Sequence, residues 1–280
     1  MLIISTVSDL LIKITELKNS QKSIGFVPTM GALHLGHGSL MEQSISENDI
    51  SIVSIFVNPR QFNNPTDLEK YPRTIESDID FLKNVGVDIV FIPTVADIYS
   101  EDFVAPKVAL GQLELLMEGK MRPGHFDGVV QVLTRLFALV QPTNAYFGLK
   151  DFQQVAVVKK LVAELQLPIN IVACPIYREK SGLAFSSRNQ RLSEDDKKKA
   201  VFIYQSLLKS KEFSNQKTPQ EIMKMMQELY AQSELELEYF EIVNPLTLNT
   251  LTDDWVKNSV ACVVAYIGGV RLIDNMALTT

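Results

Sequence analysis

The sequence has few cysteines, few histidines and no long apolar run. Its two cysteines, Cys174 and Cys262, exclude a disulfide framework and a cysteine-rich zinc module. Both lie in apolar surroundings, so we expect inert, buried thiols. The longest uncharged apolar stretch, residues 259–270, is shorter than the roughly 20 residues that a membrane-spanning helix needs. The first residues also lack the pattern of a signal peptide, so we expect a cytoplasmic protein without a membrane partner.

Neither sign of charge dominates the chain. Lysine and arginine total 27 against 33 aspartates and glutamates, which gives a net charge of −6. This balance argues against a protein that coats nucleic acid, although a local basic pocket for a small anion remains possible. Hydrophobic residues make up 46% of the 280 residues, enough for a sizeable core. At about 150 residues per domain, the length indicates about two domains.

The first part of the chain alternates apolar strand patterns with helical patterns. We predict a doubly wound α/β domain over residues 1–176, with a parallel sheet, because solidly apolar strands separated by helices are typical of a sheet covered on both faces. Ligands bind such sheets at the carboxyl ends of the strands. The predicted strands are 24–27, 50–57, 87–92, 145–147 and 169–174, and the predicted helices are 35–46, 74–84, 129–140 and 152–165.

The remainder, residues 177–280, has a different order of elements. Helical patterns at 194–210 and 219–232 precede strand patterns at 237–243, 259–267 and near 270–273. Helices followed by strands indicate a small α+β domain. We expect this domain to close over a ligand bound to the first one.

Two histidines stand where the first predicted strand runs into a helix. His34 and His37 are three positions apart, so they share one face of that helix. Gly31 and Gly36 allow a close approach of the backbone, and a helix N-terminus attracts anions. We therefore predict a phosphate-binding site for a nucleotide. The same spacing would also suit a pair of surface histidines or two metal ligands, but only His125 is left as a third histidine.

A second polar segment, residues 180–189, contains glycine, serines and cations just beyond the sheet. Small hydroxyls and an arginine can bracket a triphosphate, although an ordinary surface loop has the same composition. Together with the histidine motif, this segment resembles the signature loops of the nucleotidyltransferase superfamily that includes class I aminoacyl-tRNA synthetases.

Six blocks of sequence resemble the pantothenate synthetase family, in the order in which that family has them. They are FVPTMGALHLGH (26–37), FVNPRQF (56–62), YPRT (71–74), RPGHFDG (122–128), FGLKDFQQ (147–154) and SSRN (186–189). The resemblance implies a Rossmann-like fold and ATP-dependent condensation of pantoate with β-alanine through a pantoyl adenylate. It also implies Mg²⁺ and a homodimer.

The resemblance further implies roles for individual residues. Gln61 and Gln154 would bind pantoate, and Gln61 would also bind β-alanine; either could instead be a surface amide. The residues with an expected catalytic role are His34, His37, Lys150 and Arg188. The residues expected to bind ATP are Met30, Gly31, His34, Gly36, His37, Gly148, Lys150, Asp151, Tyr177, Phe185, Ser186, Ser187 and Arg188.

The sequence departs from the family pattern at three positions. Phe185 stands where methionine is frequent, and Leu149 replaces a commonly acidic residue. A pair of aspartates is here Ser77 and Asp78, which leaves Asp78 as a weak candidate for a metal ligand. His125 would either line the substrate tunnel or form a structural turn.

Two other functions share part of this pattern. A nucleotidyltransferase acting on a phosphorylated alcohol or a nicotinate-type acceptor would have the histidine motif but not the two glutamine blocks. A non-catalytic module that binds ATP or RNA would need a basic surface, and the net acidity counts against RNA.

Overall fold

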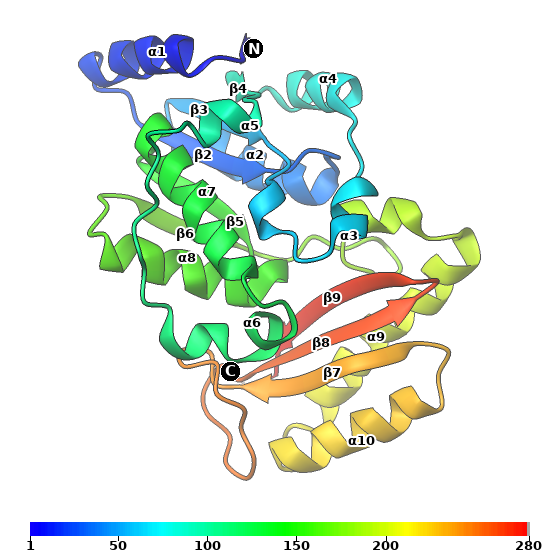
Figure 1. The fold of residues 1–280 in the computed structure, drawn as a ribbon. Helices are drawn as coiled ribbons and strands as arrows, with labels where there is room; N and C mark the ends of the chain where they lie inside the picture. Colours follow the sequence, from blue (N-terminus) through cyan, green and yellow to red (C-terminus); the bar gives the residue numbers. More distant parts are fainter. Residues whose placement is uncertain (279–280) are drawn as a thin grey trace. The chain divides into compact units, whose positions relative to one another are not determined.

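The computed structural model describes residues 1–278, and these divide into two compact units. Unit 1 comprises Met1–Leu149 and Gln154–Pro175; unit 2 comprises Lys150–Gln153 and the chain from Ile176 onward. The prediction of a doubly wound parallel sheet and a small α+β domain is confirmed (Figure 1). Within residues 1–278, no helix combines the length and the apolar character that crossing a membrane requires.

Unit 1 is built on a six-stranded sheet in the order β1-β4-β3-β2-β5-β6, and every pair of neighbouring strands is parallel. The strands are β1 (Leu2–Ile4), β2 (Ile24–Thr29), β3 (Ile50–Ile55), β4 (Ile89–Phe91), β5 (Asn144–Gly148) and β6 (Asn170–Cys174). The α-helices are α1 (Val7–Asn19), α2 (Leu35–Glu47), α3 (Pro65–Glu69), α4 (Ile75–Val85), α5 (Val95–Ile98), α6 (Met117–Met121), α7 (His125–Val140) and α8 (Phe152–Glu164). The 3₁₀ turns are η1 (Pro59–Gln61) and η2 (Gly111–Glu114). A third, η3 (Leu149–Asp151), follows β5, and its last two residues belong to unit 2.

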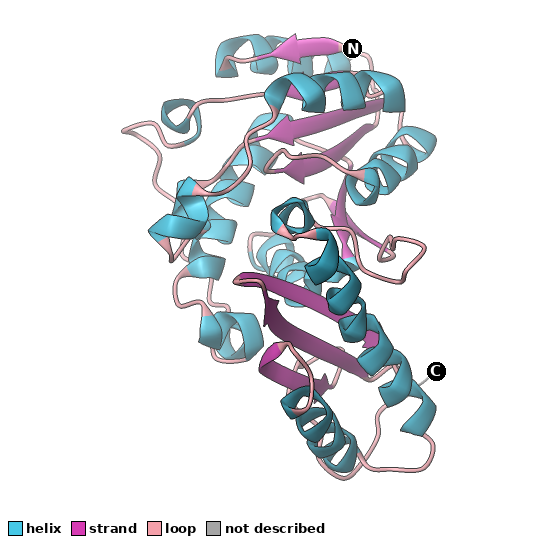
Figure 2. Ribbon diagram, turned by 90° about the vertical axis from the view of Figure 1, so that its right-hand side faces the viewer, coloured by secondary structure: helices cyan, strands magenta, loops and turns pink. Residues whose placement is uncertain are grey.

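Helices cover both faces of this sheet, as Figure 2 shows with helices in cyan and strands in magenta. On one face, Leu40 and Met41 of α2 pack with Val27 of β2 and Val53 of β3 in one buried cluster. On the other face, the ring of Phe137 in α7 meets Phe26 and Phe147 edge-on, at centroid distances of 6.4 and 6.5 Å. The strands are therefore apolar toward both faces, which explains their solid hydrophobic pattern.

The first two elements were not predicted. Leu2–Ile4 pairs with β4 at the edge of the sheet, and α1 follows with Leu10, Ile14 and Leu17 buried. The Thr6 side chain caps α1 by accepting a hydrogen bond from the Asp9 amide.

Unit 2 contains an antiparallel sheet in the order β7-β8-β9 with helices packed on it. Its elements are η4 (Ser187–Arg191), α9 (Glu194–Phe213), α10 (Pro219–Ala231), β7 (Glu236–Val243), β8 (Val260–Ile267) and β9 (Val270–Ala277). The last strand continues four residues beyond the predicted end at Ile273.

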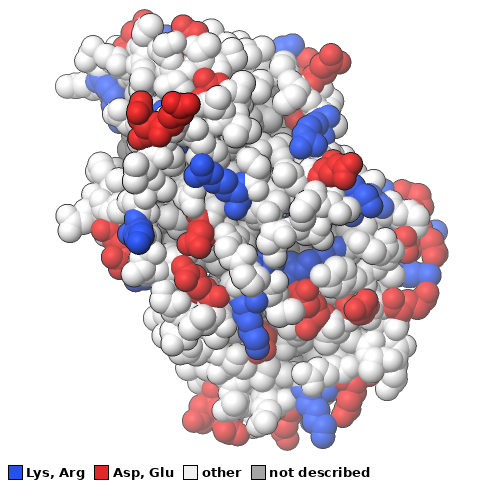
Figure 3. Space-filling view, in the orientation of Figure 1, with Lys and Arg blue, Asp and Glu red and all other residues white. Residues whose placement is uncertain are grey.

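On the face that Figure 3 presents, acidic and basic side chains are interspersed.

Both cysteines are buried, as expected. Burial is the main cause that raises the pKa of the Cys174 thiol, to about 11. A thiol with such a pKa carries almost no thiolate at neutral pH, so it is a poor nucleophile.

A buried ion pair ties the start of unit 2 to its last strand. Arg178 donates two hydrogen bonds to Asp274, at 2.6 and 2.9 Å, and the Asp274 side chain is only 3% exposed. The same guanidinium lies 4.5 Å from the centroid of the Tyr204 ring. Breaking a buried pair from one side leaves a charge without compensation.

We therefore predict that Asp274→Asn lowers the free energy of unfolding of unit 2 by about 3–5 kcal/mol. The single tryptophan, Trp255, packs against the core of this unit, so its fluorescence during urea unfolding provides the measurement. The matched control is Glu234→Gln, which breaks the exposed pair with Lys199 and should cost about 0–1 kcal/mol. Equal losses in the two variants would contradict the prediction.

Candidate active site

The histidine motif follows β2 directly and leads into α2. Gly31 and Ala32 both have left-handed backbone conformations, with φ of +79° and +49°, so the chain turns sharply between strand and helix. A left-handed alanine costs roughly 1–2 kcal/mol, so other contacts must compensate for this turn. His34 then forms the N-cap of α2, and its ring stacks on that of His37 with centroids 4.0 Å apart.

The contacts that hold this turn come from Asp78 on α4. The amide of Ala32 donates to Asp78 Oδ2 at 2.9 Å, and the amide of Leu33 donates to Oδ1 at 2.8 Å. The Thr74 hydroxyl donates to Oδ1 as well, at 3.2 Å. Both carboxylate oxygens are thus occupied by protein donors. This side chain therefore anchors the loop, and the suggested role of Asp78 as a metal ligand stays a prediction.

The same bonds define which amides an anion can reach. The amides of Ala32 and Leu33 serve Asp78, and those of His37 and Gly38 donate to the carbonyl of His34. In the first turn of a helix the amides lack helical acceptors. Of the backbone donors expected for an anion at this junction, the amides of Leu35 and Gly36 are therefore the remaining candidates, together with the two imidazoles.

Gln61 lies in η1, just beyond the end of β3, and is 9% exposed. Its Oε1 accepts a hydrogen bond from Asn58 Nδ2 at 3.0 Å, and its Nε2 lies 3.1 Å from Met30 Sδ. Asn58 is in turn oriented by Tyr99, whose hydroxyl donates to Asn58 Oδ1 at 2.7 Å. Burial is the main cause that raises the pKa of Tyr99, to about 12, so the hydroxyl stays protonated and can donate. The structure thus places Met30 and Gln61 next to each other, although the sequence analysis assigned them to different substrates.

Asn58 and Tyr99 were missed by the sequence analysis. The Asn58 side chain accepts from the Arg60 amide, so it caps η1, and Pro59 follows at the first position of the turn. An asparagine before a proline at the end of a strand is a recognisable cap signal. For Tyr99 no local signal exists, because its partner lies 41 residues away.

His125 has a structural position. Arg122 Nη1 lies 3.1 Å from its Nε2, and its Nδ1 lies 2.8 Å from the carbonyl oxygen of Gln61. Because arginine can only donate, Nε2 accepts, and Nδ1–H donates to the Gln61 carbonyl. Of the two interpretations of His125, the geometry favours the structural one: the residue fixes the backbone of η1.

Gly148 ends β5, and Lys150 and Asp151 follow in η3. The backbone carbonyl of Lys150 accepts a hydrogen bond from Asn275 Nδ2 at 3.0 Å, so this turn is held to β9 within unit 2. Gln154 is half-buried in the first turn of α8, and within residues 1–278 no hydrogen bond joins it to Gln61.

The predicted loop in unit 2 forms a short antiparallel bridge between Arg178 and Ala184. The amide of Phe185 donates to the carbonyl of Tyr177 at 3.1 Å, and the rings of these two residues lie 5.6 Å apart. Ser186 then caps η4 by accepting from the Arg188 amide. The bridge, the cap and the ion pair of Arg178 give this loop a defined shape, in contrast to an ordinary surface loop.

Among residues 1–278, no group of three or more histidine, cysteine, aspartate or glutamate side chains is placed to hold a metal ion.

Comparison with known proteins places these features in a family. The family model described as Pantoate-beta-alanine ligase matches residues 2–277. A pantothenate synthetase from Bacteroides fragilis is 45% identical over 279 residues, covering 99% of this chain and 98% of the relative.

Two solved structures match the whole fold. The pantothenate synthetase of Thermus thermophilus has a TM-score of 0.93 and 42% identity, with complete coverage of both chains. The pantoate–β-alanine ligase of Francisella tularensis, described as a complex with β,γ-ATP and β-alanine, has a TM-score of 0.82 and 38% identity. That comparison covers all of this chain and 98% of the other.

Proposed function

The chain belongs to the pantoate–β-alanine ligase family, and we propose that it condenses pantoate with β-alanine through a pantoyl adenylate formed from ATP. In the first step, a carboxylate oxygen of pantoate bonds to the α-phosphorus of ATP, and the bond to pyrophosphate breaks. In the second step, the uncharged amine of β-alanine attacks the acyl carbon, AMP leaves with the bonding electron pair, and the nitrogen loses a proton. The observation that carries this proposal is the stacked histidine pair at the N-terminus of α2.

A carboxylate is already ionised at neutral pH, so the first step needs no strong general base. The protein must align the reactants and stabilise the negative charge that builds up on pyrophosphate. The imidazoles of His34 and His37 and the amides of Leu35 and Gly36 are donors at one helix end, where anions are favoured. Met30 and Gly31 border the same loop and complete the proposed ATP contacts of this segment.

Gln61 suits the role of binding pantoate. Its oxygen already accepts from Asn58 and one Nε2 hydrogen is directed at Met30 Sδ, so the second Nε2 hydrogen is the part of the amide that is available to a carboxylate or hydroxyl. The Tyr99–Asn58–Gln61 chain fixes this orientation before substrate arrives, which reduces the cost of ordering on binding. We assign pantoate contacts to Gln61 and Gln154, and a β-alanine contact to Gln61.

For unit 2 taken by itself, we propose that the loop after Tyr177 contributes contacts to the nucleotide. Tyr177 and Phe185 offer aromatic surfaces, while hydroxyls and a guanidinium suit phosphate oxygens. The proposed nucleotide-binding residues that follow Gly148 are Lys150, Asp151, Tyr177, Phe185, Ser186, Ser187 and Arg188, of which Lys150 and Arg188 stabilise charge on pyrophosphate.

We treat Mg²⁺ as part of the substrate MgATP, where it offsets phosphate charge, because the described residues provide no cluster of ligands of their own. The homodimer that the family resemblance implies is a further proposal, which light scattering of the purified protein checks directly.

We predict that His37→Ala leaves the fold intact and slows pantoate-dependent release of pyrophosphate from ATP by roughly a hundredfold or more. Loss of one hydrogen-bond donor that stabilises developing charge typically slows the chemical step by a factor of this size. The assay omits β-alanine, so it reports the first step alone as a burst whose rate is measured. Circular dichroism provides the control for folding, and a burst at the wild-type rate would remove His37 from the mechanism.

We also predict that Gln61→Ala raises the KM for pantoate far more than the KM for ATP. A substrate group left without its buried amide partner costs about 1–3 kcal/mol, or roughly five- to 150-fold in affinity. Gln154→Ala should act in the same direction. The matched control is Gln112→Ala, an exposed glutamine in η2, which should leave both KM values unchanged. Equal increases for both substrates would show that these amides serve the nucleotide or the fold.

A further inference from the structure

We propose that Asp78 is a positioning residue of the first step, because its carboxylate sets the path of the loop that carries His34 and His37. This inference rests on the proposed role of the histidine pair. Asp78 is 2% exposed and belongs to α4, far in sequence from the loop that it contacts. It therefore acts on the nucleotide step through the backbone of residues 31–33, and not by touching the reacting atoms.

The bonding pattern of Asp78 suits a carboxylate and no other side chain of its size. Its two oxygens receive the amides of Ala32 and Leu33 and the hydroxyl of Thr74, at 2.8 to 3.2 Å. All three partners donate, so the site requires acceptors only. An asparagine has the same shape, but its NH₂ group would face one of these donors and could accept from none of them.

The loop conformation that these bonds hold is one that the backbone does not favour by itself. Gly31 and Ala32 are left-handed in succession, and Ala32 is not a glycine. The nearest atom to a Cβ built at Gly31 would be Asp78 Oδ2, at 3.0 Å, so the carboxylate also fits closely against the turn. Without the two amide bonds, the chain between β2 and α2 gains access to more favoured conformations.

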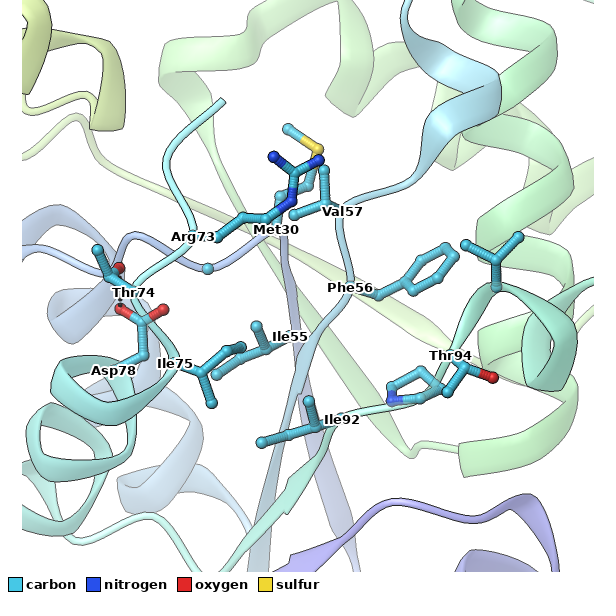
Figure 4. A pocket seen from close by; sticks show the side chains of 13 residues that line it. Met30, Ile55, Phe56, Val57, Arg73, Thr74, Ile75, Asp78, Ile92 and Thr94 are labelled. Atoms are coloured by element: carbon cyan, nitrogen blue, oxygen red, sulfur yellow. Dashed lines mark hydrogen bonds between the residues drawn. The ribbon is translucent and has the colours of Figure 1, made fainter. Parts of the chain in front are cut away.

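Packing cannot replace these bonds, because a cavity lies on this side of the loop. Figure 4 shows the cavity, which has a volume of about 220 Å³. Met30, Gly31, Thr74 and Asp78 line one part of it. The rest is lined by apolar side chains at and just beyond the ends of β3 and β4, together with Arg73, Ile75, Thr94 and Val95. The drawn hydrogen bond joins Thr74, the N-cap residue of α4, to Asp78 in the first turn of that helix. Residues 30 and 31 therefore have open space beside them into which the loop can relax.

The test compares Asp78→Asn with Asp80→Asn in the full-length protein. Asp80 is on the same helix, but its side chain is 72% exposed and pairs only with Lys83. We expect Asp78→Asn to slow the pyrophosphate burst by at least about tenfold, because a displaced donor loses alignment with the charge it stabilises. The KM for pantoate and the Mg²⁺ concentration that gives half the maximal rate should stay within about twofold of wild type. Asp80→Asn should match the wild type in all three quantities.

A second variant and a second readout separate positioning from stability. Thr74→Val removes one bond to Asp78 but leaves both loop amides bound, so its burst should be slowed less than that of Asp78→Asn. Because the chain has only three histidines, imidazole NMR signals can be followed individually. Asp78→Asn should shift the signals of His34 and His37 and leave that of His125, whose ring is held by Arg122 and the Gln61 carbonyl, unchanged.

Three results would overturn the proposal. The first is a burst in Asp78→Asn as fast as in Asp80→Asn. The second is an increased Mg²⁺ requirement, which would return Asp78 to the role of a metal ligand. The third is a set of unchanged His34 and His37 signals. The NMR readout does not depend on catalysis, so a failure of the adenylate mechanism itself would be recognised separately, by the absence of a burst in the wild-type protein.

Discussion

Two hydrogen bonds, from the amides of Ala32 and Leu33 to the carboxylate of Asp78, hold the turn on which the rest of the histidine site depends. They keep two successive left-handed residues in place between β2 and α2. With the turn fixed, His34 occupies the N-cap position of α2 and its ring stacks on that of His37, so two imidazoles lie at the N-terminal end of the helix. A positive helix end with imidazole donors favours phosphate, which explains why this strand–helix junction suits a nucleotide.

The surroundings of Gln61 in unit 1 are likewise organised by hydrogen bonds in which each acceptor has a protein donor. Tyr99 donates to Asn58, Asn58 donates to Gln61, and His125 donates to the Gln61 backbone. In each of these residues one polar atom is fixed by a hydrogen bond, so the orientation of the other polar atom of the side chain or peptide group is defined. Gly128 lets α7 approach closely, since a Cβ there would lie 2.2 Å from the Arg60 carbonyl oxygen. The Gln61 amide is therefore oriented by long-range contacts and not by the short η1 turn alone.

The sequence predicted the features that depend on local pattern. Strands buried on both faces were visible as solid apolar runs. The glycine- and histidine-rich junction also has a local pattern, from which we predicted an anion site. The edge strand Leu2–Ile4 was missed because it has only three residues, too few to show a strand pattern. The α1 helix did carry a signal, in Thr6 and the spacing of Leu10, Ile14 and Leu17. The role of Asp78 could not be predicted, because the amides that it binds are backbone groups 45 and 46 residues away.

Amide hydrogen exchange of Ala32 and Leu33 tests the central claim most directly. In the wild-type protein both amides are bound to a buried carboxylate, so the account predicts slow exchange for both. In Asp78→Asn they should exchange at least about tenfold faster, while amides in the middle of β2 keep their rates. Fast exchange of both amides in the wild type, or equal rates in the two proteins, would contradict the claim that Asp78 holds this loop.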